Sequence, residues 1–121
     1  MYIERRQVDL TTNAAGDVTG YTPVVTGRIL AIVYVKDDFD AGVDFTITVE
    51  KTGEQVWTEE NVDVSKTVYP HIAAHDNAGV GVTFDGTNEI YVPISVANDR
   101  IKIVVAAGGN AKSGTFHVIV G

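Results

Sequence analysis

Two histidines are the residues whose spacing first suggests chemistry. His71 and His75 lie four positions apart, and Asp76 follows directly. On a helical turn this spacing would place both imidazoles on one face, where they could share a metal ion. The acid that a metalloprotease motif carries between its histidines is absent, since the interior holds Ala73 and Ala74. We prefer the interpretation of both residues as polar loop histidines, and we predict no metal site.

A second candidate is an acidic stretch with carboxylates spaced by two and four residues. Asp38, Asp40 and Asp44 share this spacing with some calcium loops. Calcium takes six to eight oxygen ligands, and its helix–loop–helix sites end in a bidentate glutamate, which is missing here. Gly42 also stands at the wrong place for such a loop. We therefore interpret the stretch as a solvated acidic turn before a strand.

The sequence offers no set of side chains arranged for catalysis. Glu59 and Glu60 are adjacent carboxylates, but neighbours in a strand point to opposite faces and do not converge. Ser65, Ser95 and Ser113 lie outside any nucleophile-elbow context, and no glycine-rich phosphate loop opens a helix. The absence of cysteine excludes disulfides, thiol nucleophiles and sulfur-ligated metals. We predict a protein that is not an enzyme and holds no cofactor.

Aromatic residues suggest one binding function. Trp57 and the five tyrosines could line a carbohydrate groove, as aromatic rings do in β-sandwich binding modules. A tryptophan in a short alternating strand also suits a hydrophobic core, so both interpretations of Trp57 stay open at this point.

The composition shows which elements must position these residues. The 121 residues include 20 Val, 10 Ile and 13 Thr but only 2 Leu. β-Branched side chains lose rotamer freedom in helices and pack well on pleated surfaces. The composition therefore predicts an all-β protein, and at this length a single domain of residues 1–121.

Alternating apolar residues predict about eight short strands. The clearest is 44–50, and the run Ile29–Val35 suits a central strand covered on both faces, for which a neighbouring subunit could supply the second cover. Pro93 indicates an edge strand or a bulge. Together these patterns predict a single-domain antiparallel β-sandwich, jelly-roll-like in its connections. The expected strands are 8–10, 24–25, 29–35, 44–50, 55–57, 90–96, 99–105 and 115–120.

Two connections stand out between these strands. The glycine-rich segment 107–114 suits a hairpin between the last two strands. The segment 65–88 is irregular, and we expect a surface excursion there that includes a short helical turn near residues 72–75. Ile90, Val92, Ile94 and Val96 form a row expected to face the core.

Charge is concentrated in one part of the chain. Residues 36–63 contain nine acids and two bases, while the remainder is balanced, and the net charge is −7. This excess opposes binding to nucleic acid or to anionic membranes, and we expect it to face solvent. No signal segment or membrane span is evident, so we expect synthesis in the cytosol. The expected solvent-facing acids are Asp37, Asp38, Asp40, Asp44, Glu50, Glu54, Glu59 and Glu60.

The N-terminal residues 1–6 combine apolar and guanidinium groups. Tyr2, Ile3, Arg5 and Arg6 have the composition of interface anchors rather than of a solvated tail. We interpret residues 1–6 as a candidate arm that contacts a partner protein or a second subunit. A frayed end or an ordinary edge strand is the alternative.

One set of stretches carries a resemblance to a known family: residues 19–22, 27–32, 34–36, 42–48, 97–104 and 114–118. These stretches resemble small virion proteins encoded by tailed bacteriophages, made in the cytoplasm of the host, and the nearest functional match is a capsid decoration, or cement, protein. The resemblance covers most of the chain and is weakest over 65–88.

This resemblance implies a sandwich or jelly roll that binds the outer capsid surface and bridges neighbouring major capsid proteins. It also implies a homodimer or homotrimer located on the virion. A head–tail joining or tail protein is one alternative, and a glycan-binding module is another. The arm of residues 1–6 would dock by strand addition to the shell.

Overall fold

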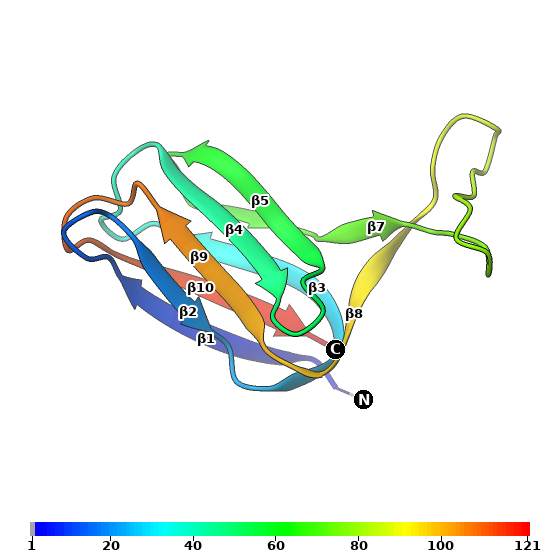
Figure 1. The fold of residues 1–121 in the computed structure, drawn as a ribbon, viewed down its shortest axis with the longest axis horizontal. Helices are drawn as coiled ribbons and strands as arrows, with labels where there is room; N and C mark the ends of the chain where they lie inside the picture. Colours follow the sequence, from blue (N-terminus) through cyan, green and yellow to red (C-terminus); the bar gives the residue numbers. More distant parts are fainter. Residues whose placement is uncertain (1) are drawn as a thin grey trace.

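The computed structural model describes residues 2–121 and shows an all-β protein of two antiparallel sheets packed face to face (Figure 1). The predicted β-sandwich is confirmed, and no helix occurs in residues 2–121. Ten strands form, rather than about eight. They are β1 (Glu4–Thr11), β2 (Val18–Tyr21), β3 (Val25–Val35), β4 (Val43–Val49), β5 (Gln55–Val62), β6 (Lys66–Val68), β7 (His71–Ala73), β8 (Tyr91–Asp99), β9 (Ile101–Ala106) and β10 (Ser113–Val120).

The larger sheet has the order β1-β10-β3-β8-β7, with β6 also paired to β3. A bulge at Leu30 explains the long apolar run in β3: Ile29 pairs with Val120 and Ala31 with Ile119, which leaves Leu30 unpaired. The extra residue shifts the alternation by one position, so that side chains before the bulge and after it both point into the core. The other face of the central strand is only partly covered, because Val33 and Val35 keep some exposure.

The smaller sheet has the order β2-β9-β4-β5. In β4, Phe45, Ile47 and Val49 are buried, as the alternation predicts. The expected pairing of β4 with the 55–57 strand is confirmed, although β5 continues to Val62.

The expected hairpin at 107–114 is wrong. β9 pairs with β2 and β4, whereas β10 pairs with β1 and β3, so this connection crosses from one sheet to the other. The alternation predicted which side chains face inward but could not tell whether they face inward from one sheet or from two. Close packing, rather than a hairpin turn, explains a glycine in this connection. A Cβ at Gly108 would lie 2.9 Å from Thr12 Cγ2, which is too close.

Aromatic rings from both sheets fill one end of the core. Tyr34, on β3, packs against Phe116 and Phe39 with ring centroids 5.2 and 6.3 Å away. Phe45, from the opposite sheet, packs against Trp57 at 5.5 Å. Trp57 is 8% exposed and belongs to this core.

The segment 69–93 leaves the sandwich as a narrow projection, called here the ribbon (Figure 1). Residues 71–73 form β7, so the expected helical turn near 72–75 is wrong. Ile94 and Val96 are buried as expected, but Ile90 and Val92 are exposed, because Ile90 precedes β8 and Val92 lies where β8 pairs only with β7, beyond the sandwich.

Candidate interaction surface

The ribbon is an insertion that interrupts a single line of strand along one edge of β3. Val68 of β6 pairs with Ile32, and Ile94 of β8 pairs with Ile29. Both strands run antiparallel to β3 along the same edge, so β6 and the second half of β8 lie in one line. The chain leaves this line after Val68 and returns to it at Ile94. Pro93 lies where β8 pairs only with β7, which fits the edge position predicted for it.

The stalk of the ribbon is the pairing of β7 with β8. His71 pairs with Pro93, and the ring of His71 lies 4.4 Å from the ring of Tyr91. The Nδ1 atom of His71 lies 2.9 Å from the carbonyl oxygen of Tyr69. These contacts hold the imidazole against the stalk.

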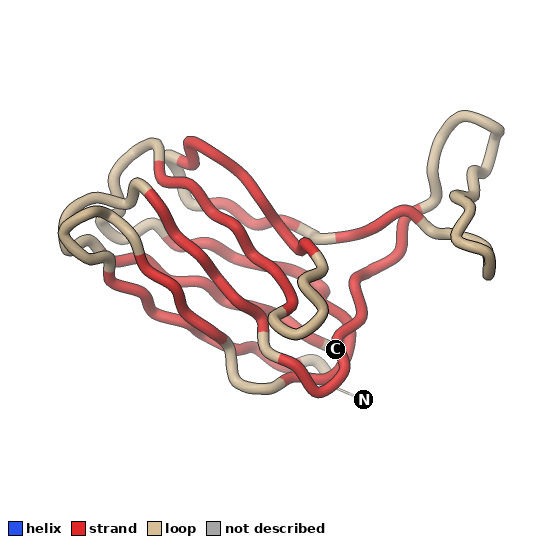
Figure 2. Tube along the Cα trace, viewed as in Figure 1, coloured by secondary structure: helices blue, strands red, loops and turns tan. Residues whose placement is uncertain are grey.

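The head of the ribbon, residues 74–90, consists of two tight loops (Figure 2). The three main-chain segments that meet at its base are joined by hydrogen bonds from the N–H of Ala74 to the oxygen of Ile90 and from the N–H of Val82 to the oxygen of Ala74. Isolated bridges join His75 to Gly81 and Thr83 to Glu89. The loops thus have a defined backbone without long strands.

An aspartate caps each loop. Asp76 Oδ1 accepts the N–H groups of Ala78 and Val80 at 2.8 and 3.0 Å. Asp85 Oδ1 accepts the N–H groups of Thr87 and Asn88 at 2.9 and 2.6 Å. These hydrogen bonds lower the pKa of both carboxyl groups, since they favour the charged form. Both loops are therefore preorganised by local hydrogen bonds.

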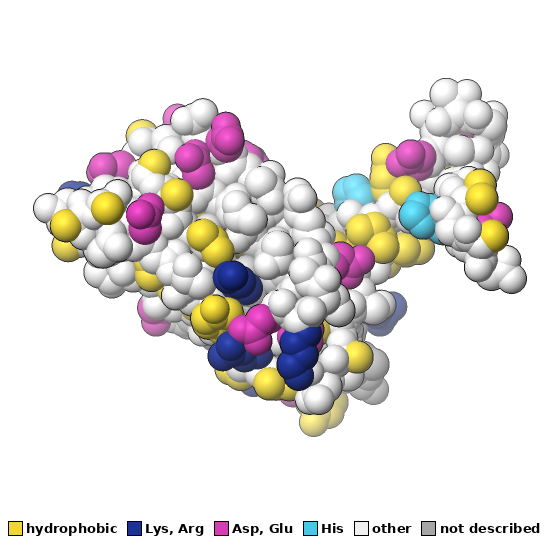
Figure 3. Space-filling model, in the orientation of Figure 1, with side chains coloured by type: hydrophobic (Ala, Val, Ile, Leu, Met, Phe, Trp, Pro, Cys, Tyr) yellow, Lys and Arg dark blue, Asp and Glu magenta, His cyan; other side chains and the backbone are white. Residues whose placement is uncertain are grey.

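No residue from 71 to 93 is buried. The segment nevertheless carries large apolar side chains, with Phe84 69% and Tyr69, at the ribbon's base, 70% exposed. Figure 3 shows yellow apolar side chains along this projection. A concentration of exposed apolar side chains on one projecting element indicates an interaction site. The exposed apolar residues are Tyr69, Ile72, Val80, Phe84, Ile90, Tyr91 and Val92.

The charged side chains of the ribbon are all acidic. No lysine or arginine occurs between Lys66 and Arg100, while Asp76, Asp85 and Glu89 are acidic. None of these three acids forms an ion pair within residues 2–121. A partner surface should therefore be apolar with positive charge around it.

The N-terminal residues form an edge strand rather than an arm over most of their length. β1 begins at Glu4, and Arg5 and Arg6 pair with Ile119 and Val118 of β10. The strand extends this far because β10 continues to Val120 and offers it hydrogen-bonding partners. Residue 1 of the expected arm lies outside the described residues.

The four predicted interface residues separate into two kinds. Arg6 is partly buried, and its Nη2 atom donates to Glu4 Oε2 at 2.7 Å, so it is occupied within the chain. Tyr2 and Ile3 are 79% and 68% exposed, and Arg5 is exposed without an ion pair.

Arg28 lies near the N-terminal residues, although the sequence did not identify it as an interface residue. Its main chain exchanges hydrogen bonds of 2.9 Å with Gly121, and a Cβ at Gly121 would lie 2.9 Å from Ile3 Cγ1. Arg28 is exposed, and no carboxylate of residues 2–121 pairs with it. We call Tyr2, Ile3, Arg5 and Arg28 the terminal corner.

The predicted acidic region is not one patch. Glu50 pairs with Arg100, whose Nε donates to Glu50 Oε1 at 2.9 Å, and this hydrogen bond lowers the pKa of Glu50. Glu59 Oε2 accepts from Lys66 Nζ at 2.9 Å, with the same effect on its pKa. Glu54 lies in the turn between β4 and β5, near Glu50.

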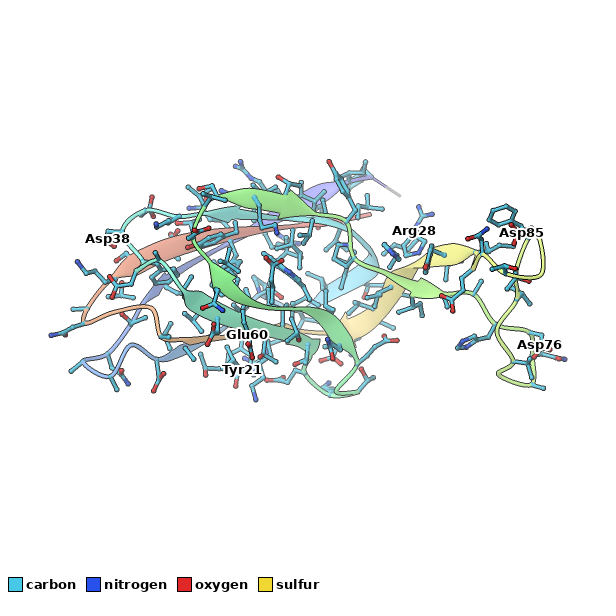
Figure 4. All side chains as sticks on the ribbon, turned by 90° about the horizontal axis from the view of Figure 1, so that it is seen from above. Tyr21, Arg28, Asp38, Glu60, Asp76 and Asp85 are labelled. Carbon is cyan, nitrogen blue, oxygen red and sulfur yellow. The ribbon has the colours of Figure 1, made fainter. Side chains whose placement is uncertain are left out.

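Four of the other predicted acids, Asp37, Asp38, Asp40 and Asp44, lie in the connection from β3 to β4 or at the start of β4, which we call the acidic end. Glu60 lies on β5, farther along the sandwich (Figure 4). Asp44 Oδ1 accepts the N–H of Asn61 at 3.0 Å, and Asp38 Oδ1 accepts the N–H of Ser113. The carboxylates of Asp38 and Asp44 thus accept hydrogen bonds from the backbone nearby. This agrees with the interpretation of 38–44 as an acidic turn. In Figure 4, Asp38 lies at the end of the molecule opposite Asp76 and Asp85.

The candidate chemical sites do not come together. His71 and His75 lie on extended backbone, where a separation of four residues spans about 13 Å rather than one helical turn. Within residues 2–121 no three His, Asp or Glu side chains are grouped for a metal ion, and no pocket occurs. In the same residues, no helix is long and apolar enough to cross a membrane.

The proposed carbohydrate groove loses its main residue. Trp57 packs in the core, and its Nε1 donates to Glu59 Oε1 at 3.2 Å, so its ring offers no open face for a sugar. Of the two interpretations of Trp57, the core position is therefore confirmed.

Sequence reasoning missed the ribbon as a surface. Ile90 and Val92 continue the alternation of Ile94 and Val96, so period alone placed them in the core. The available signal was the run of residues 67–99 without a single lysine or arginine, combined with turn residues and aromatics.

Comparison of the sequence with protein-family models and with curated proteins finds no match.

Proposed function

We propose that this chain is a structural virion protein that binds the outer surface of a bacteriophage capsid and stabilises it by bridging neighbouring major capsid proteins. The ribbon carries this proposal. It is a projecting element with defined loops, exposed aromatic and aliphatic side chains and no buried residue from 71 to 93. Such an element gains its main free energy from a partner protein rather than from its own domain.

The fold supports the same function. The sheet orders β1-β10-β3-β8 and β2-β9-β4-β5 place β1 beside β10 and β2 beside β9, strands from opposite ends of the chain, and this arrangement supports the jelly-roll assignment. Two packed sheets give a rigid body, and the ribbon extends the contacts that this body can make. The function would be mechanical: added binding energy at many equivalent positions opposes the outward pressure of a packaged genome.

Charge suggests an orientation. The acidic end lies opposite the ribbon, and it would face solvent while the ribbon reaches over the shell (Figure 4). Negative charge on the outer side would keep the free protein soluble and limit nonspecific adsorption.

A head–tail joining or tail protein remains the second candidate, because the same ribbon would serve at a ring of subunits. Copy number separates the two functions. A decoration protein covers the whole shell in many copies, whereas a joining protein occupies one vertex. The buried position of Trp57 removes the observation that favoured a glycan-binding module.

Quantitative protein analysis of purified particles, together with the radial position of this chain by electron cryomicroscopy, tests the proposal. We expect many copies at the largest radius of the head. Particles stripped of the protein should release DNA at lower temperature, and adding back the wild-type chain should restore their stability. A location inside the head, or at the tail vertex alone, would overturn the decoration function.

A further inference from the structure

The geometry points to a second copy of this chain as the partner of the ribbon's head: the head of one copy docks on the terminal corner of the next, and the exposed apolar side chains of the base and stalk, Tyr69, Ile72, Tyr91 and Val92, remain for the shell. This inference does not depend on the capsid, because it concerns contact between free molecules. It is carried by two exposed apolar surfaces of opposite charge on the same chain.

The head supplies an acidic apolar surface. Val80 and Phe84 are exposed on its loops, and Asp76, Asp85 and Glu89 accompany them. Asp76 Oδ2 and the carboxylate of Glu89 accept no hydrogen bond from residues 2–121, so they are free to accept from a guanidinium group. The loops are already fixed by their aspartate caps, which reduces the entropy lost on binding.

The terminal corner supplies the complementary surface. Tyr2 and Ile3 are its exposed apolar side chains, and Arg5 and Arg28 are its cations. Neither arginine forms an ion pair within residues 2–121. Arg28 Nε donates only to the carbonyl oxygen of Gly121, at 3.2 Å, which leaves its other donors available.

The two surfaces do not meet within one molecule. The ribbon projects away from the sandwich, and the terminal corner lies on the sandwich itself, where β1 begins and β10 ends (Figure 1). Each copy therefore offers one donor surface and one acceptor surface. Such a head-to-tail contact repeats from copy to copy and closes into a ring when the rotation between copies allows it.

A complementation experiment tests this contact. The first variant, Arg5→Glu with Arg28→Glu, loses the corner but keeps the ribbon. The second replaces residues 69–93 by Ser-Thr, joining Val68 to Ile94 in line along β3, and keeps the corner. Sedimentation velocity over a range of concentrations measures association, and circular dichroism checks that each variant folds.

We expect the wild-type chain to self-associate and each variant alone to be monomeric, with dissociation constants raised at least roughly tenfold. An equimolar mixture of the two variants should form a one-to-one heterodimer, because the ribbon of the first meets the corner of the second. The control Lys51→Glu with Lys112→Glu changes the total charge equally but should leave association unchanged.

If the ribbon replacement fails to fold, the variant Val80→Arg with Phe84→Arg takes its place, since both side chains are exposed and form no strand pairs. A monomeric wild-type chain, a variant that associates as the wild type does, or a mixture without heterodimer would each overturn the inference. Failure of capsid binding would be a separate result, because no shell is present in this experiment.

Discussion

Tyr34 and Phe45 join the two sheets through an edge-to-face contact with ring centroids 4.6 Å apart. Tyr34 lies on β3 and Phe45 on β4, and both are buried. The contact places a phenol group in the core, and the hydroxyl of Tyr34 has no hydrogen-bond partner in residues 2–121.

Tyr34→Phe should therefore keep or raise stability. It retains the ring contacts and removes a buried hydroxyl without a partner, whose burial costs about 1 kcal/mol or more. Urea unfolding should show an unchanged slope and a midpoint equal to or above that of the wild type. A loss of more than about 1 kcal/mol would mean that the hydroxyl is satisfied after all.

The same residue predicts a loss of stability at alkaline pH. Burial raises the pKa of Tyr34 to about 12, above its ordinary value near 10. The unfolded chain then releases this proton at lower pH than the folded chain, so stability is full below pH 10 and falls as the pH rises toward 12. We expect a difference on the order of 2 kcal/mol between wild type and Tyr34→Phe across this interval, measured by unfolding at fixed pH values.

Gly114→Ala should destabilise the sandwich. A Cβ at Gly114 would lie 2.3 Å from Cε2 of Phe39, a buried ring, which must move. Overpacking of this kind costs about 1–3 kcal/mol. Gly81→Ala is a matched control, because its Cβ would meet only His75 Cδ2 at 3.8 Å, and equal effects of the two substitutions on the melting temperature would contradict the packing argument.

Asp99→Ala should also lower stability, through two backbone groups. The buried carboxylate of Asp99 accepts the N–H of Lys51 at 3.1 Å and that of Arg100 at 2.7 Å. Removing it leaves both donors without this partner, at a cost of about 1–3 kcal/mol. Asp17→Ala is the control: that exposed side chain accepts no hydrogen bond, and its free energy of unfolding should match the wild type.

Asp76→Ala should loosen one loop of the head without affecting the core. The N–H groups of Ala78 and Val80 lose their acceptor, so their hydrogen exchange should accelerate. Global unfolding should be unchanged, because no residue from 71 to 93 is buried. Unchanged exchange at both amides would show that the loop is fixed by other contacts.

Much of the sandwich follows from the sequence, and the departures have physical reasons. Alternation in β4 and β10 predicted their buried rows, because each strand faces a core on one side only. The same alternation failed at Ile90 and Val92, since a strand can continue past the edge of the sandwich without any change in its pattern. Pattern also could not show that Glu50 and Glu59 are neutralised by Arg100 and Lys66, residues distant from them in sequence or on another strand.

The sequence predicted only part of the terminal corner. Tyr2, Ile3 and Arg5 were identified by composition, but Arg28 joins them only through the pairing of β3 with the chain end at Gly121. That contact spans most of the chain, and no local pattern encodes it.

Val68 and Ile94 lie in line along one edge of β3. This alignment separates the residues that fold the sandwich from the residues that attach it to a partner. The strand pairs of β3 with β6 and with residues 94–99 of β8 do not use residues 69–93, so we expect the scaffold to fold with an insert of another length or sequence. Related chains could therefore diverge quickly in what they attach to and slowly in how they fold. The same junction would accept a foreign peptide, which makes it a natural place to display one.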